Sequence, residues 1–313
     1  MIEEIINQGM LAIDQYIEKV VGSQVDVLHD ASIHIVMSGG KRLRPKMAML
    51  AYLAAGGEEL QDVIGLAAAV ELVHTATLVH DDINDHSLTR RGKATVHARW
   101  GRTFALLTGD YMFAKVYEMM APFGNPYNEI MSQAAVRLVE GETLQAAAAK
   151  SGNMDRETYK QIIGLKTASL FEASARMGAN LATDDQVVVD ALANYAYNLG
   201  LTFQIVDDIL DIIGDPETLG KPVGTDLAQG RGVMAVQNGD ASFSGDGTAT
   251  AVAEKDPLQS MMTRLRESGA VEIARLQAKE MGARARAALA HVPPSPARDE
   301  LDDLIDLVLD RDR

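Results

Sequence analysis

The sequence contains no cysteine, a single tryptophan and few aromatic residues, which make up 5% of its 313 positions. The absence of cysteine excludes disulfides, thiolate zinc sites and a cysteine nucleophile, and it fits a reducing compartment. Basic residues are also scarce, because 29 lysines and arginines stand against 44 acidic residues and give a formal net charge of −15. Binding to a nucleic-acid backbone needs a basic surface, so we expect no nucleic-acid partner. A small anionic ligand is still allowed, since a few clustered cations are enough for one phosphate site.

Long apolar runs and targeting signals are missing as well. No stretch of 18 or more apolar residues occurs, and the most apolar segment, 66–80, is interrupted by Glu71, His74 and His80. The first ten residues carry acidic side chains where a secretion signal would have a positively charged segment. We therefore expect a cytoplasmic protein without a transmembrane segment.

Good helix formers are abundant. Apolar residues recur at spacings of three and four over long stretches, glycine and proline clusters separate these stretches, and alternating strand patterns are rare. The pattern predicts an all-α fold, a single large helical bundle formed by residues 1–313, with a flexible Gly-rich loop around 239–256. The predicted helices cover residues 2–20, 25–37, 46–55, 60–85, 104–120, 130–149, 156–178, 184–213, 258–290 and 298–313.

A five-residue motif, Asp-Asp-x-x-Asp, occurs twice, at 81–85 and 207–211. Each copy lies at or near the end of an apolar helical stretch. Because its first and last aspartates are four residues apart, they share one helix face. Stacked carboxylates repel each other unless a cation neutralises them. Their hard oxygen atoms suit Mg²⁺, which is typically held by one or two carboxylates together with substrate phosphates. A solvated acidic helix end would explain one copy, whereas two copies on apolar helices favour a metal site.

Cationic residues recur near both copies of the motif. The segment 39–44 reads Gly-Gly-Lys-Arg-Leu-Arg and enters a helix, a place where anions bind. Arg90 and Arg91 follow the first copy, Lys221 follows the second, and Lys166 lies within an uncharged helical stretch. Each of these cations alone could simply face solvent. Together with the carboxylates, they predict a site for a diphosphate and Mg²⁺.

Motifs for other chemistries fail on inspection. The chain has neither a P-loop nor a dinucleotide-binding glycine fingerprint after a strand. Glu71 and His74 have the spacing used in di-iron bundles, but that site needs two such pairs, and no other histidine has a glutamate three positions earlier. His74 instead lies two turns before Asp81 on roughly the same face. A hydrogen-bonded core histidine is the alternative.

Taken in order, these motifs resemble those of the trans-isoprenyl (polyprenyl) diphosphate synthase family. The resemblance covers about residues 39–231, most of the chain. It rests on GGKRLRP (39–45), ELVHTATLVHDDIND (71–85), RRGKATVH (90–97), LTGDY (107–111), VEGETLQ (139–145), LKTASL (165–170), LTFQIVDDILD (201–211) and GKPVGTDL (220–227).

The resemblance implies a helical fold around a deep central cavity and a homodimer. It also implies an Mg²⁺-dependent prenyltransferase that condenses isopentenyl diphosphate with an allylic diphosphate. Three Mg²⁺ ions are expected to bind together with the diphosphate. The implied metal ligands are Asp81, Asp85 and Asp207, and the implied catalytic residues are Lys166, Thr167 and Gln204. The implied diphosphate ligands are Lys41, Arg44, His74 and Arg91 for the isopentenyl substrate, and Arg90, Lys166 and Lys221 for the allylic one, while Arg231 can also meet phosphate.

The same resemblance bears on product length. Thr77 lies four residues before Asp81 on the same helix face, at a level where aromatic residues in the family stop chain growth early, and Ala76 is its neighbour. Both side chains are small, and each further turn adds about 5.4 Å of depth, close to one isoprene unit. We therefore expect a product longer than C15, of C20 or more, with the long-chain type favoured.

Four alternatives and one departure accompany this interpretation. The product could be geranylgeranyl diphosphate specifically. A class I terpene cyclase would be expected to carry an Asn/Ser/Glu-type second metal motif, and a subunit of a heteromeric synthase would be expected to lack carboxylates or cations. A helical scaffold would explain none of the motifs. The departure follows GKPVGTDL, where the family commonly has Lys and then Thr-Leu-Pro and this chain has Gly-Arg-Gly-Val-Met-Ala at 230–235.

Overall fold

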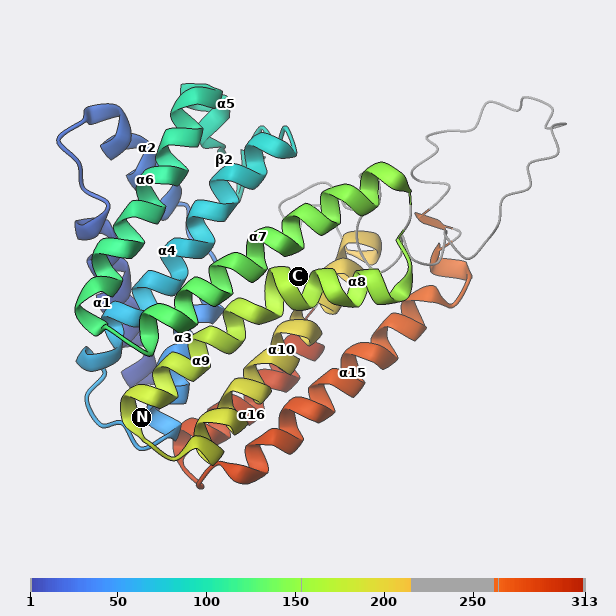
Figure 1. Ribbon diagram of the computed structural model, residues 1–313. Helices are drawn as coiled ribbons and strands as arrows, with labels where there is room; N and C mark the ends of the chain where they lie inside the picture. The colour runs from blue at the N-terminus through green and yellow to red at the C-terminus, as the bar shows by residue number, and fades with distance from the viewer. Residues whose placement is uncertain (1, 153, 215–261, 264, 312–313) are drawn as a thin grey trace, which may run out of the picture. The chain divides into compact units, whose positions relative to one another are not determined.

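The structure, a computed structural model, describes residues 2–152, 154–214, 262–263 and 265–311. These residues are mostly helical, and the strands among them form one short pair (Figure 1). The all-α prediction is confirmed. The helices are α1 (Ile2–Val20), α2 (Asp26–Val36), α3 (Leu43–Ala54), α4 (Gln61–Asn84), α5 (Val96–Trp100), α6 (Arg102–Met120), α7 (Tyr127–Ser151), α8 (Arg156–Ile163), α9 (Ser169–Ala182), α10 (Gln186–Ile213), α15 (Ala270–Ala288) and α16 (Pro296–Leu309), with 3-10 turns at Ala121–Phe123 and Leu289–His291.

The chain divides into two compact units, and each contains one Asp-Asp-x-x-Asp motif. A single domain over 1–313 stays a prediction, and the Gly-rich segment 239–256 lies outside the described residues. The first unit consists of Met1–Ala135, Leu170–Ala196 and Ala288–Asp303, and the second of Val136–Ser169, Tyr197–Ala287 and Leu304–Arg313.

Helix α4 is the centre of the first unit. It packs against α1, α3 and α6, which Figure 1 shows beside it. Its apolar residues are spread around the whole helix, and a helix of that kind is stable only when it is buried. Leu66, Val70 and Val73 are among its buried side chains. This burial fixes the axis of the helix whose last turn carries the first motif.

Among the described residues, α4 is also the helix that is long and apolar enough to cross a membrane. However, 72% of its apolar window is buried inside the protein. The core helix of a soluble protein satisfies the same criterion of length and composition, so the criterion is weak evidence for a membrane span here.

Helix α4 is followed by a two-stranded hairpin, and the sequence pattern does not predict this hairpin. Strands β1 (Thr89–Arg90) and β2 (Lys93–Ala94) pair antiparallel, with Arg90 opposite Lys93. The two connecting residues, Arg91 and Gly92, have φ angles of 52° and 74°, as the tightest hairpin turns require. A left-handed conformation costs a non-glycine residue about 1–2 kcal/mol, and such strain often lies at functional sites.

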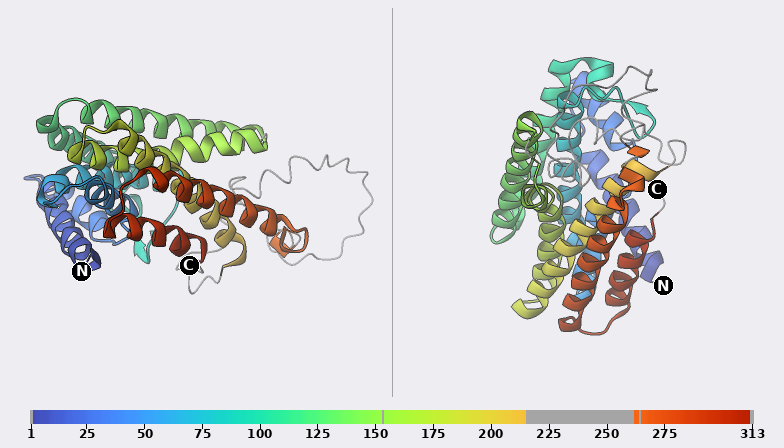
Figure 2. Two further views of the ribbon diagram at one scale, coloured as in Figure 1. Left: turned by 90° about the horizontal axis from the view of Figure 1, so that it is seen from below. Right: turned by 90° about the vertical axis from the view of Figure 1, so that its right-hand side faces the viewer.

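The second unit has its core between α8, the C-terminal part of α10 and α15. Ile162, Ile205, Ile209 and Val271 belong to one cluster of buried apolar side chains contributed by these helices. Figures 1 and 2 show α15 alongside α10. Burial of each such side chain stabilises the fold by about 1.5–3 kcal/mol. The cluster therefore fixes the helix that carries the second motif.

The predicted helix over 156–178 is interrupted. Between α8 and α9, Gly164–Ala168 form one turn of π-helix. Such a turn re-aims the side chains within it and is frequent at functional sites. A Cβ atom at Gly164 would lie 2.6 Å from the Tyr197 hydroxyl oxygen, so a larger residue at the start of the turn would require the Tyr197 side chain to shift.

Candidate active site

The six aspartates of the two motifs differ in burial. Three are partly exposed, and these are the three that the family resemblance assigns to metal. The other three are buried, with at most 5% of their surface exposed. The partly exposed residues are Asp81, Asp85 and Asp207, and the buried ones are Asp82, Asp208 and Asp211.

In the first unit, Asp81 and Asp85 lie at the C-terminal end of α4. The backbone N–H of Asp85 donates to the carbonyl oxygen of Asp81 at 2.8 Å, and the last turn contains no basic residue. The C-terminal end of a helix carries partial negative charge, which adds to that of the carboxylates. No group of three potential metal-binding side chains occurs among the described residues. A pair of carboxylates fits Mg²⁺, which keeps several waters and is typically held by one or two carboxylates together with substrate phosphates.

Asp82, between these two, faces inward and organises the hairpin. Its Oδ1 atom accepts a hydrogen bond from Arg90 Nε at 2.7 Å, and the carboxylate is only 1% exposed. Burial raises the pKa of Asp82, while the charge of Arg90 opposes that shift. A charge-assisted bond of this kind is short and strong. It therefore links the turn predicted to bind metal directly to one of the cations predicted to bind diphosphate.

Three further predicted ligands, Arg44, His74 and Arg91, meet in the first unit. The Arg44 guanidinium lies 4.9 Å from the centre of the Phe171 ring, and its Nε atom is buried with no hydrogen-bond partner among the described residues. Burial lowers the pKa of Arg44 to about 10, against the attraction of Glu71 and with a smaller lowering from Arg91. Like charges gathered this closely are stabilised by a bound anion.

His74 is neutral in this surrounding. Burial first, and then the nearby positive charges of Arg44 and Arg91, hold its pKa well below 6.5. A neutral imidazole still has one N–H group to donate. The residue can therefore bind a phosphate oxygen without adding a further charge to the cluster.

The loop that delivers Arg44 is fixed by its neighbour Arg42. Arg42 has a left-handed φ of 48°, and its guanidinium forms ion pairs with Glu71 at 2.6 Å and Asp14 at 3.1 Å. It also donates to the carbonyl oxygen of Val36 at 2.9 Å. Arg42 thus anchors the loop, while the predicted ligand Lys41 is exposed in the same loop.

The hairpin and the glycine-rich loop are in direct contact. Arg91 donates to the carbonyl oxygen of Gly39, and Lys93 donates to that of Met37 at 2.8 Å. A Cβ atom at Gly40, whose φ is +141°, would lie 2.6 Å from Arg91 Cζ. Gly40 therefore allows the backbone to approach the guanidinium closely, which brings the segments predicted to bind isopentenyl diphosphate together.

In the second unit, Asp207 already has a cationic partner. Arg311, which follows α16, lies 3.2 Å from Asp207 Oδ1, and its guanidinium is 4.5 Å from the centre of the Phe203 ring. Sequence reasoning missed this contact, since nothing in the sequence near the end of the chain connects position 311 with the motif.

Lys166 is held by the segment VEGETLQ of α7. Its Nζ atom forms an ion pair with Glu142 and donates to Gln145 Oε1 at 3.0 Å. Gly141 permits the close approach of the two helical segments, because a Cβ atom there would lie 2.7 Å from the backbone nitrogen of Lys166. Glu142 and Gln145 had no predicted role, although their segment contributes to the resemblance.

Thr167 and Gln204, two of the three predicted catalytic residues, are in direct contact. The Thr167 hydroxyl donates to Gln204 Oε1 at 2.8 Å. Thr167 comes from the π-turn, and Gln204 lies one turn before Asp208 on α10. The second unit therefore gathers a cation, a hydroxyl, an amide and a carboxylate motif.

The family model described as polyprenyl synthetase matches residues 25–240. The chain belongs to the polyprenyl synthetase family. This membership confirms the predicted family, and with it the enzyme class, a prenyltransferase.

Individual members of the family match over most of their length. The octaprenyl diphosphate synthase of Escherichia coli is 35% identical over 320 residues, which is all of this chain and 98% of the relative. The geranylgeranyl diphosphate synthase of Saccharolobus solfataricus is 40% identical over 243 residues, or 74% of this chain and 71% of the relative. A polyprenyl synthase from Caulobacter crescentus, complexed with calcium and isoprenyl diphosphate, is 33% identical with a TM-score of 0.90 over 99% of this chain and 97% of that one.

The residues expected to set product length in this polyprenyl synthetase lie inside α4. Ala76 and Thr77 are both buried, and the Thr77 hydroxyl donates to the carbonyl oxygen of His74 at 2.8 Å. With its hydroxyl bonded to the helix, Thr77 presents no free donor. Lys221 and Arg231, the remaining predicted ligands, lie outside the described residues.

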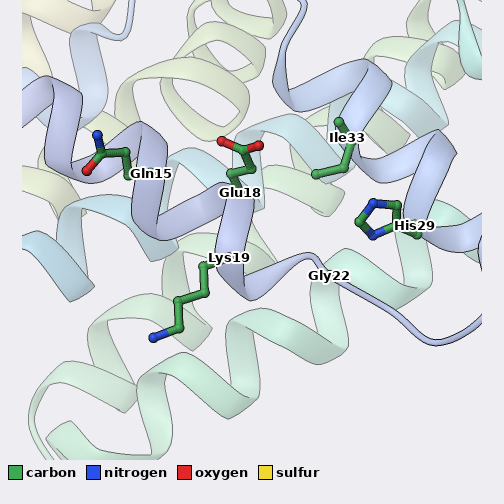
Figure 3. Close-up of a pocket in the computed structure, with 6 residues that line it drawn as sticks. All are labelled: Gln15, Glu18, Lys19, Gly22, His29 and Ile33. Carbon is green, nitrogen blue, oxygen red and sulfur yellow. The ribbon is translucent and has the colours of Figure 1, made fainter.

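A surface pocket of about 450 Å³ lies between α1 and α2 of the same enzyme (Figure 3). It contains none of the predicted site residues. Its lining combines charged and neutral side chains, and we assign it no role in prenyl transfer. The lining residues are Gln15, Glu18, Lys19, Gly22, His29 and Ile33.

Proposed function

We propose that this polyprenyl synthetase condenses isopentenyl diphosphate with an allylic diphosphate, releases inorganic diphosphate and forms a trans-polyprenyl diphosphate longer than C15. One observation carries the proposal. A cluster of Arg44, Arg91 and neutral His74, suited to an anion, lies in the same unit as the carboxylate pair Asp81 and Asp85, which suits a divalent cation. A substrate that carries both diphosphate and Mg²⁺ needs this combination.

The metal ligands in this proposal are Asp81, Asp85 and Asp207, and the family is of the Mg²⁺-dependent type. Three ions with bound diphosphate are our expectation. When bound, Mg²⁺ supplies Lewis-acid stabilisation of the departing diphosphate. The partial exposure of these three aspartates supports the assignment, because a metal ion with bound diphosphate needs accessible carboxylate oxygens, whereas Asp82 and Asp208 are buried.

Binding of the two substrates is divided among the cations. Arg44, His74, Arg91 and Lys41 hold the diphosphate of isopentenyl diphosphate. Arg90, oriented by Asp82, and Lys166 hold the allylic diphosphate, together with Lys221 and with Arg231 as a further phosphate ligand. Fixed cations of this kind stabilise charge as it develops on the leaving group.

The reaction follows from this arrangement. The allylic carbon–oxygen bond breaks and its electron pair leaves with diphosphate. The double bond of the isopentenyl group then forms a new bond to the allylic carbon, and a proton passes from the adjacent carbon to an oxygen of the released diphosphate. Thr167 and Gln204 lie beside the reacting carbon, where their oxygen atoms face positive charge. Exclusion of water protects the cation from hydrolysis.

Product length is proposed to follow from the small side chains in α4. Ala76 and Thr77 leave space where a large side chain would block the growing chain. A long-chain product is favoured, and the octaprenyl synthase that matches the whole chain supports this choice. A geranylgeranyl product is the alternative, which the partial match to a geranylgeranyl synthase represents.

We further propose a homodimer, acting in the cytoplasm. Helix α6 exposes several large apolar side chains, including Phe104, Leu107 and Tyr117. An exposed apolar surface of this kind is commonly covered by a partner, and a second copy of this chain is the partner that the family suggests.

The direct test is an elongation assay. The purified protein is incubated with Mg²⁺, labelled isopentenyl diphosphate and geranyl, farnesyl or geranylgeranyl diphosphate, and the products are sized by chromatography. We expect products of C20 or longer, and a shorter distribution from Thr77→Phe. Absence of elongation with every primer would contradict the proposed function, and a C15 product alone would contradict the role of Ala76 and Thr77.

A further inference from the structure

A buried tyrosine in the second unit lies behind the second motif and has no role in the reaction described above. Tyr159 of α8 donates its hydroxyl hydrogen to Asp208 Oδ2 at 2.8 Å. Both side chains are buried, with 3% and 5% of their surface exposed. The other oxygen of the same carboxylate, Asp208 Oδ1, accepts from Gln204 Nε2 at 2.9 Å.

This chain of hydrogen bonds continues to Thr167. Gln204 Oε1 accepts from the Thr167 hydroxyl at 2.8 Å. Four side chains from α8, the π-turn and α10 are therefore connected in the order Tyr159, Asp208, Gln204 and Thr167. All three contacts have the lengths of normal hydrogen bonds.

The chemistry of the four groups fixes the direction of every bond. A carboxylate only accepts, so Gln204 must turn its NH₂ group toward Asp208, which leaves its carbonyl oxygen facing Thr167. With the carbonyl there, the hydroxyl of Thr167 must act as the donor. If the amide were reversed, the hydroxyl oxygen would accept from the NH₂ group instead, and one of its lone pairs would be occupied.

The orientation of the amide therefore sets the polarity of Thr167. A hydroxyl that donates to Gln204 keeps its own lone pairs available to a neighbouring positive charge. Oriented dipoles act most strongly where water is excluded and where charge develops during the reaction. An allylic cation beside Thr167 would be stabilised in one orientation and less stabilised in the other.

Packing explains why Tyr159 can act as the fixed end of this chain. Its ring belongs to the same buried apolar cluster as Ile205 and Ile209, which flank the motif on α10. A ring packed in this way places its hydroxyl at one position. The Asp208 carboxylate is consequently held from behind by Tyr159 and presents its second oxygen to Gln204.

We propose that Tyr159 is a positioning residue of the prenyl transfer step, which holds Asp208 so that the Gln204 amide presents its oxygen to Thr167. This inference rests on the proposed function. It assigns to Asp208 the role of orienting Gln204 rather than binding metal.

The test compares two tyrosines that lose the same group. Tyr195 is also buried, and its hydroxyl donates to the carbonyl oxygen of Leu301 at 2.5 Å in the first unit, with no role in the reaction. In the elongation assay, we expect Tyr159→Phe to lower kcat about tenfold, equivalent to about 1.4 kcal/mol in the barrier, with the KM of both diphosphates within about twofold. The two variants should lower the melting temperature by similar amounts, and Tyr195→Phe should leave kcat unchanged.

A double-mutant cycle separates positioning from a general loss of stability. If Tyr159 acts through Gln204 on Thr167, then Tyr159→Phe should cost little in a Thr167→Val background, because the hydroxyl it orients is already absent. Equal losses of kcat in both backgrounds would overturn the proposal, as would an equal loss of kcat in Tyr195→Phe.

A measurement without turnover distinguishes failure of this inference from failure of the proposed function. The side-chain NH₂ signal of Gln204 can be followed by NMR in protein labelled with ¹⁵N-glutamine, and identified by its disappearance in Gln204→Met. We expect the signal to shift and exchange faster with solvent in Tyr159→Phe and to remain unchanged in Tyr195→Phe. An unchanged signal in Tyr159→Phe would overturn the inference even in an active enzyme, whereas absence of elongation by the wild-type protein would contradict the proposed function alone.

Discussion

The two Asp-Asp-x-x-Asp motifs share their spelling but differ in the environment of the second aspartate. In the first unit, Asp82 accepts from the charged side chain of Arg90, and the contacts around it are ionic. In the second unit, Asp208 accepts from the uncharged groups of Tyr159 and Gln204. The second aspartate of the first motif is thus connected to a cation that we propose binds diphosphate, and that of the second motif to dipoles that we propose lie beside the reacting carbon. Duplicated sequence does not imply duplicated function, because the neighbours of each carboxylate decide what it does.

The largest effect on kcat is expected from replacing a partly exposed aspartate, because these are the positions that we propose bind metal. Asp81→Ala should lower kcat by roughly 10²–10³-fold, as removal of a group that stabilises charge in the transition state does. The elongation assay over a range of Mg²⁺ concentrations measures it. Asp30→Ala, on an exposed position of α2 in the same unit, is the control and should retain activity. Full activity of Asp81→Ala would refute the metal assignment.

A second prediction contrasts the second aspartate of each motif directly. Asp82→Asn should mainly raise the KM for the allylic diphosphate, about tenfold or more, because Arg90 loses a charge-assisted bond of about 1.5–3 kcal/mol. Asp208→Asn should mainly lower kcat, because an asparagine there can present its NH₂ group to Gln204 and reverse the amide. Steady-state kinetics with each substrate varied in turn measures both. The same kinetic change in both variants would show that the two motifs do not differ in the way proposed.

A third prediction concerns the contact between loop and hairpin, for which the first unit contains a matched pair of glycines. Gly40→Ala should raise the KM for isopentenyl diphosphate several-fold, because the new methyl group would displace the Arg91 guanidinium. Gly39 has a φ of +77°, and a Cβ atom there would meet none of the described residues within 4 Å. Gly39→Ala should therefore cost about 1–2 kcal/mol of folding stability with little change in KM. Thermal melting and kinetics together separate the two, and a reversed order would refute the proposed contact.

The sequence predicted most of the fold because apolar spacing marks helices well when they are long. The helix predicted over 2–20 has those bounds, and that over 60–85 differs by one residue at each end. The hairpin was missed because a turn centred on Arg91 and Gly92 lacks the asparagine or aspartate that commonly signals one. The π-turn was missed because a single added residue does not disturb the apolar period enough to be visible in the sequence.

The candidate site was predicted residue by residue, but its supporting contacts were not. Motif spacing pointed to Asp81 and His74, and the family resemblance added Thr167. The residues that contact the site residues come from distant segments of the chain. Tyr159, for example, donates a hydrogen bond to Asp208 across 49 positions of sequence. A lone buried tyrosine has no signature in one sequence, because its hydrogen-bond partner is decided by packing. Contacts of this kind require the folded structure.

The smallest effect expected is a pH dependence of stability that belongs to the ionic first unit. The pKa of His74 is lowered first by burial and then by the positive charges of four arginines, which are Arg44, Arg91, Arg90 and Arg42. In the unfolded chain the histidine binds a proton below about pH 6.5, while in the folded chain it resists protonation. The unfolded state then binds more protons, so the contribution of neutral His74 to stability is complete above that pH and is lost as the pH falls toward the lower folded pKa.

Comparison with a variant isolates this contribution. The melting temperature of the wild-type protein should fall more steeply between about pH 7.5 and 5 than that of His74→Gln, which has no group to protonate. His29→Gln, which removes an exposed histidine of the same unit, controls for loss of a histidine as such and should follow the wild-type curve. Parallel curves for the wild type and His74→Gln would mean that the histidine is as readily protonated in the folded cluster as in the unfolded chain. That result would refute the lowered pKa of His74, and with it the assignment of this histidine to a buried cluster of positive charge.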